Sequence, residues 1–177
     1  LDANTGPLLE PVEAALLDAT RVSSNYALDD VPAGMRNFHV LYALQTPGPL
    51  TLFPSLRNRD FRLAPRRDVD ENADVARWEA AADAVLVEGG VAPERWKRLM
   101  AVAAGLLHLG EWDGTSTPNN TSNDLALAAE LLLGSANAAP RLAEALCAVG
   151  EAPHERRALR DAVVRGIYAR LFQHVVT

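Results

Sequence analysis

The stretch PERWKRLMAVAAGLLHLG, residues 93–110, decides the fold class of this chain. Pro93 suits the first turn of a helix, where its missing N–H would have no intrahelical partner. Apolar residues then recur at helical spacing until Gly110, a residue type that commonly ends helices. These apolar residues are Trp96, Leu99, Ala103, Leu106 and Leu107. The pattern predicts a helix with one apolar face that must pack against other elements.

Helical patterns continue on both sides of this stretch. Upstream, Asp70 is a suitable N-cap for a helix that Gly89-Gly90 would end. Downstream, Ser122 or Asn123 can cap a helix over 124–133 that Gly134 closes. Further helices are predicted from Pro140 to about residue 149 and from about Pro153 to Val176. The glycine-, threonine- and asparagine-rich segment 111–123 is predicted to be a surface loop.

The first third of the chain is less regular. Residues 7–17 are too apolar for a loop and fit either a strand or a helix, whereas residues 36–44 fit a helix. Prolines at 47, 49 and 54 predict an irregular segment over 45–69. The predicted fold class is mainly α, as one unit over 1–177, with a short N-terminal strand-like segment and irregular loops.

Composition excludes several classes of protein. Hydrophobic residues make up 49% and charged residues 23% of the chain, the balance of an ordinary soluble protein. A net charge of −6 argues against general nucleic-acid binding. No apolar run reaches the roughly 18 residues of a membrane span, and a signal peptide is missing. The lone Cys147 cannot form an internal disulfide and is expected in the core of a cytoplasmic protein.

The residues offer no catalytic constellation. A phosphate-binding Gly-x-x-x-x-Gly-Lys-Ser/Thr loop is missing, and Lys97 is the only lysine. The four histidines are widely separated, which predicts neither a metal site nor a cofactor site. His39 and His108 lie inside apolar helical segments, so we expect them to be hydrogen-bonded structural residues.

Basic residues gather in two clusters. The first contains Arg57, Arg59, Arg62, Arg66 and Arg67, and the second His154, Arg156, Arg157, Arg160, Arg165 and Arg170. Such clusters are usually solvated, salt-bridged surface. The functional alternative is contact with an acidic protein surface, which these charges would steer.

Several short segments resemble, in the same order, parts of the myosin motor family. They are LLDATRV at 16–22, RNFH at 36–39, DFRL at 60–63, LLHLG at 106–110, AELLLG at 129–134, RDA at 160–162 and IYARLF at 167–172. Each segment is mostly helix core, but their shared order and spacing is specific. The resemblance covers nearly the whole chain and corresponds to the family's upper fifty-kilodalton subdomain, which lies between switch I and switch II.

The resemblance implies an internal part of an actin-based, ATP-driven cytoskeletal motor, forming one wall of the actin-binding cleft. The phosphate loop and both switches are missing here, so this segment would bind no Mg-ATP and would not hydrolyse ATP by itself. The implied partners are the actin filament and the remainder of the motor, in the cytoplasm. Because the chain does not begin with Met, we expect it to be a piece of a longer protein.

By resemblance, two segments are the candidates for actin contact. The first is the loop beginning at Asp113, Gly114 and Thr115. The second begins with the dipeptide at 150–151 and matches the start of the family's cardiomyopathy loop. Its candidate residues are Gly150, Glu151, His154, Arg156 and Arg157. This second segment is shorter than the family's, and the first has no lysine or arginine. Two alternatives stay open: a stand-alone helical protein-interaction module without ATPase activity, and an all-α ligand-binding domain.

Overall fold

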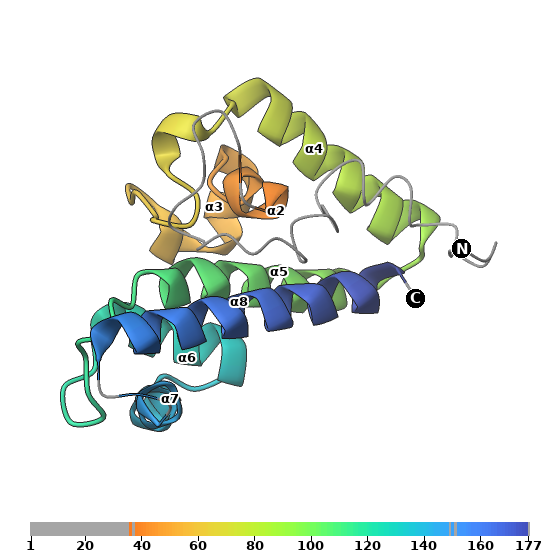
Figure 1. Cartoon of the computed structure of the whole chain (residues 1–177). Helices are drawn as coiled ribbons and strands as arrows, with labels where there is room; N and C mark the ends of the chain where they lie inside the picture. The colour runs from red at the N-terminus through yellow and green to blue at the C-terminus, as the bar shows by residue number, and fades with distance from the viewer. Residues whose placement is uncertain (1–35, 37, 149, 151, 177) are drawn as a thin grey trace, which may run out of the picture.

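The computed structural model describes residues 36, 38–148, 150 and 152–176 (Figure 1). Within these residues the chain is mainly helical and contains no β-strand beyond two isolated bridges, which confirms the predicted fold class. The prediction of a strand-like segment near residues 7–17 lies outside the described residues.

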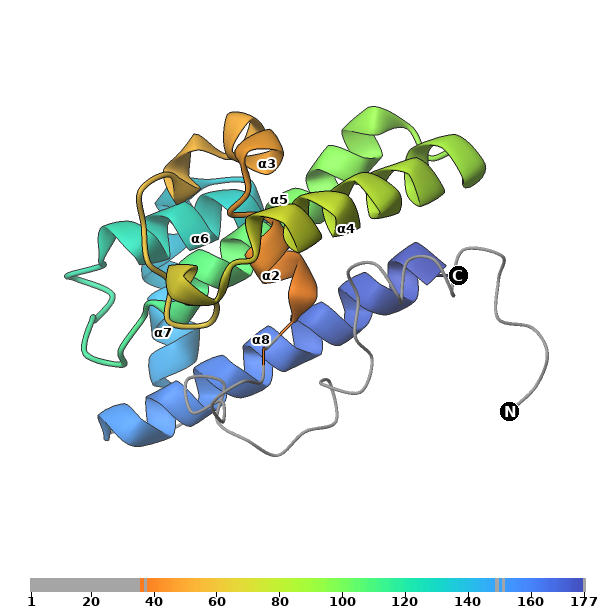
Figure 2. The ribbon, with the colours of Figure 1, turned by 90° about the horizontal axis from the view of Figure 1, so that it is seen from above.

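Helix α5 (Pro93–Gly110) is the centre of the molecule and has ten buried residues. Helix α8 (Pro153–Val176) runs beside it, and α6 (Asn123–Leu133) packs on another side, as Figures 1 and 2 show. A Cβ at Gly105 would lie 2.8 Å from Leu132 Cγ, so α5 and α6 approach closely at this point. Helix α7 (Ala139–Cys147), preceded by a 3-10 turn over Ala136–Ala138, packs on α6 and α8.

The opposite side of α5 is covered by α2 (His39–Ala43), α3 (Pro47–Leu52) and α4 (Glu71–Asp83). Short 3-10 turns over Pro54–Leu56 and Arg66–Asp68 link α3 to α4. The side chain of Asp70 caps α4 by accepting from Ala73 N–H, as predicted. Helix α4 continues as a π-turn over Ala84–Glu88 and ends before Gly89-Gly90.

One predicted irregular segment contains a helix. The prolines over 45–69 were expected to prevent regular structure, but Pro47–Leu52 is the α-helix α3, with proline in its first turn. Proline fits there because the first N–H groups of a helix have no intrahelical acceptor. The remainder of the segment consists of 3-10 turns and loops.

Aromatic and apolar side chains from both sides of α5 form one core. Phe38 stacks on Tyr168 with 3.7 Å between ring centroids, which joins the segment before α2 to α8. Trp78 of α4 contacts Trp96 of α5. Cys147, expected to be buried, is only half-buried, although it packs against this core.

Candidate functional site

The loop between α5 and α6 is held in a defined path at its start. Asp113 Oδ1 accepts hydrogen bonds from Thr115 N (2.9 Å) and Thr115 Oγ1 (2.6 Å). These bonds hold the pKa of Asp113 below its usual value. Gly114 has a φ of 84°, and a Cβ there would lie 2.6 Å from the carbonyl oxygen of Pro153. Glycine is therefore required where the loop touches the first residue of α8.

Two arginines of α8 bind the same loop through its backbone. Arg156 Nη1 donates to Gly114 O at 3.2 Å and Arg156 Nε to Gly150 O at 2.9 Å. Arg157 Nη1 donates to Asp113 O at 3.4 Å. Both arginines are half-buried. Their hydrogen bonds go to the protein's own carbonyls, so they position the loop.

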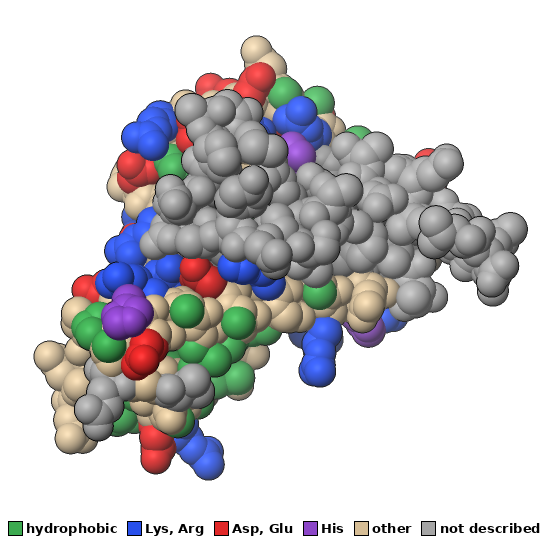
Figure 3. All heavy atoms as spheres, in the orientation of Figure 1, with side chains coloured by type: hydrophobic (Ala, Val, Ile, Leu, Met, Phe, Trp, Pro, Cys, Tyr) green, Lys and Arg blue, Asp and Glu red, His purple; other side chains and the backbone are tan. Residues whose placement is uncertain are grey.

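The structure therefore brings together most of the residues named as actin-contact candidates. The two segments, more than thirty residues apart in sequence, meet at one end of α5 and α8. Thr115 and His154 are exposed at this junction, whereas Gly114 is buried. Glu151 lies outside the described residues. Figure 3 shows acidic, basic and apolar side chains mixed on this end of the molecule.

Sequence reasoning missed the role of Arg160, which it placed in a solvated basic cluster. That interpretation is wrong for this residue, because its side chain is completely buried. Arg160 Nη1 donates to Gly110 O (2.9 Å) and Trp112 O (2.8 Å), and Nε donates to Asp161 Oδ1 (2.8 Å). Gly110 is the last residue of α5. A cation at this position satisfies carbonyls that a helix end leaves without partners.

A second buried network centres on His108 of α5. Its Nδ1 lies 2.9 Å from Asp124 Oδ1 and its Nε2 lies 3.0 Å from Ser55 Oγ. Asp124 also accepts from Arg59 Nη2 at 2.8 Å. The imidazole is completely buried, and this burial lowers its pKa more than Asp124 raises it. Burial favours a protonated Asp124, but hydrogen bonds from Arg59 and His108 together outweigh it and lower the pKa of that carboxyl.

The hydrogen-bonded series Ser55, His108 and Asp124 resembles a catalytic triad, in which the histidine would accept the proton of the serine hydroxyl. Two further requirements are unmet at Ser55. The N–H groups of Leu56 and Arg57 already donate to Phe53 O and Pro54 O, so they are not available to stabilise an oxyanion. Neither pocket described below includes Ser55. The network therefore links α5, α6 and the turn after α3, and it confirms that the side chain of His108 is hydrogen-bonded within the protein.

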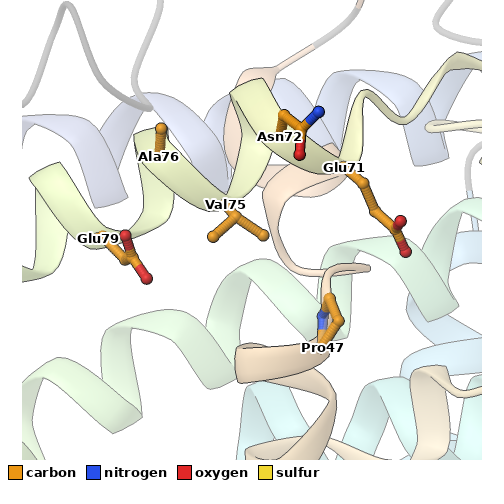
Figure 4. Close-up of a pocket in the computed structure, with 6 residues that line it drawn as sticks. All are labelled: Pro47, Glu71, Asn72, Val75, Ala76 and Glu79. Carbon is orange, nitrogen blue, oxygen red and sulfur yellow. The ribbon is translucent and has the colours of Figure 1, made fainter.

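Two surface pockets lie elsewhere. One has a volume of about 350 Å³ and is lined by Pro47, Glu71, Asn72, Val75, Ala76 and Glu79 (Figure 4). The other, of about 580 Å³, is lined by Leu133, Ser135, Asn137, Ala138 and Arg141. Neither pocket is lined by a histidine. Ser135, in the second pocket, carries the only hydroxyl among the lining residues of the two, and none of the residues that line its own pocket could act as its base. Among the described residues, no three His, Cys, Asp or Glu side chains come close enough to hold a metal ion.

The chain matches no known family model and no curated protein. None of the described helices combines the length and apolar character needed to cross a membrane.

Proposed function

We propose that this chain is an internal segment of an actin-based, ATP-driven motor and forms part of one wall of the filament-binding cleft. The observation that carries the proposal is the contact between loop 111–122 and the first turn of α8. The family resemblance assigns these two segments to filament contact separately. Their contact gives them one continuous surface, which a single partner can cover.

The segment's part in the motor is mechanical. Helices α5 and α8 lie side by side, and Arg160 joins the end of α5 to α8 inside the protein. A displacement of α8 therefore carries the loop after α5 with it. Closure of a cleft around a filament depends on such rigid coupling between helices. The segment supplies no catalytic residue, and Mg-ATP is held by other parts of the motor.

The named residues of the junction carry little net charge. Arg156 and Arg157 keep their positive charges although they bind backbone carbonyls, and Asp113 and Glu155 offset them with two negative charges. Electrostatic steering toward an acidic filament is therefore weak. We expect the isolated chain to bind filaments weakly, with shape rather than charge determining the contact.

Filament binding is tested by co-sedimentation of the 177-residue chain with actin filaments. Two added charges, His154→Glu with Thr117→Glu, place carboxylates on both exposed segments of the junction and should abolish the sedimented fraction. The matched control, Ala80→Glu with Val87→Glu, adds the same charge to exposed positions on α4 and its π-turn. It should sediment like the wild type. Equal sedimentation of both variants would contradict the junction as the contact surface.

The native size of the product tests the motor itself. An antibody to this segment should detect a band much heavier than 19.1 kDa in source-cell extract. A band at 19.1 kDa whose protein does not sediment with filaments would refute the proposal. That result would favour the stand-alone interaction module.

A further inference from the structure

The groove between α4 and the start of α3 combines an apolar floor with carboxylates. Glu71, Val75 and Glu79 follow one another at four-residue spacing, so they share one face of α4. Figure 4 shows Val75 between the two carboxylates, on the side of α4 toward Pro47. The groove thus offers an apolar surface with a negative charge at each end.

These two carboxylates differ from Asp74, another acidic residue of the same helix. Asp74 is completely buried and accepts from Arg36 Nη1 (2.8 Å), Arg36 Nη2 (2.9 Å) and Arg77 Nη1 (3.0 Å). Glu71 and Glu79 are exposed, and they have no hydrogen-bond or ion-pair partner in the described part of the chain. The internal charges of this region are therefore satisfied at Asp74, which leaves the groove carboxylates available to a partner.

We infer that this groove docks a basic amphipathic helix of a partner protein. Glu79 lies eight positions after Glu71 in helix α4, a rise of about 12 Å. A second helix with lysine or arginine at two positions eight apart, and an apolar residue midway, presents the complementary pattern over the same length. The order of charged, apolar and charged residues is the same from either end of the groove. The partner helix can therefore bind parallel or antiparallel to α4. Binding of an amphipathic helix by an apolar groove is a common recognition mode.

The occupant's charge follows from the groove. Both ionisable lining residues are acidic. Local attraction therefore favours a basic partner, and an acidic helix would meet like charges at both ends of the groove. This inference concerns a different face from the proposed filament contact and does not depend on it.

The probe is a synthetic helix of about 20 residues, long enough to be partly helical in water. It is rich in alanine and glutamine, carries a central leucine with arginine four residues before and after it, and bears a fluorescent label. A small set varies the central residue among leucine, phenylalanine and methionine. Fluorescence anisotropy with the full 177-residue chain measures binding. We expect at least one of these peptides to bind the wild type, and a version with glutamate in place of arginine not to bind.

The variants distinguish the groove from general charge attraction. Glu71→Gln with Glu79→Gln should weaken peptide binding roughly twofold to thirtyfold, the range for two exposed charge pairs. The control, Glu130→Gln with Glu144→Gln, makes the same charge change at exposed positions on α6 and α7 and should leave binding unchanged. Equal weakening by both variants, or no binding of any peptide to the wild type, overturns the inference. Sedimentation of the chain alone gives a further check. A dimer lost only in the groove variant would identify a second copy as the occupant and would also overturn it.

Discussion

Replacing Arg160 by methionine should destabilise the chain more than any change of an exposed arginine. The methionine keeps much of the aliphatic volume but removes all the donors. Gly110 O and Trp112 O then lose their partner at the buried end of α5, and Asp161, 5% exposed, loses its ion pair with Arg160.

The expected cost follows from these three losses. Breaking a buried ion pair by removing one partner costs about 3–5 kcal/mol, and each buried carbonyl left unsatisfied adds about 1 kcal/mol or more. Relaxation and water entry offset part of the sum, since Asp161 is not completely shielded from solvent. We expect a loss of about 4 kcal/mol, a large fraction of the roughly 5–15 kcal/mol typical of a domain.

Urea unfolding followed by circular dichroism measures this loss directly. Arg170→Met is the matched control, because Arg170 is exposed on the same helix; it should change stability by less than about 0.5 kcal/mol. Arg160→Lys, which keeps the charge but not the planar fork, should fall between the two. A loss for Arg160→Met within about 1 kcal/mol of the control would refute the conclusion that this side chain joins α5 to α8.

Three further perturbations test other parts of the structure. Burial lowers the pKa of His108 below its ordinary 6.5, so the unfolded chain takes up this proton first and stability should fall as the pH decreases through about 6.5. His108→Gln should flatten the difference between urea midpoints at about pH 7.5 and about pH 5; an unchanged difference would exclude His108 as its source. Gly110→Ala would place a Cβ against Leu63 Cγ in the core and should cost about 1–2 kcal/mol by urea unfolding, whereas a gain would show that Leu63 yields. Gly134→Ala has open space around its Cβ but a φ of 78°, so it should cost about 1 kcal/mol in the same assay from strain alone, and no loss would contradict that reading of the α6 end.

Helices with local start and stop signals were predictable from sequence. Pro93 begins α5 and Gly134 follows α6, as predicted, because these residues act through their own backbone preferences. Gly110 is also the last residue of α5, as predicted, but it keeps a helical backbone, and its lack of a Cβ makes room for Leu63. The helix over Pro47–Leu52 was not predictable in the same way. Its prolines are compatible with either a first helical turn or a loop, and tertiary packing decides between them.

The site was less predictable than the fold. The resemblance named the two candidate segments, but only their path in space shows that they touch. Arg160 looks in sequence like the other arginines of its helix, and its burial depends on the end of α5, 50 residues earlier. The adjacent Asp161 was the one hint in the sequence that Arg160 is buried, because a buried arginine needs a carboxylate nearby to balance its charge.

The way in which α8 holds the loop after α5 has a consequence for how this region changes during evolution. Arg156 and Arg157 bind the carbonyl oxygens of Gly114 and Asp113, and every amino acid carries such an oxygen. Substitutions along the loop therefore leave these anchors in place, provided that Gly114 keeps its backbone conformation. The side chains that the loop displays can therefore change from one sequence to another while its backbone keeps the same position.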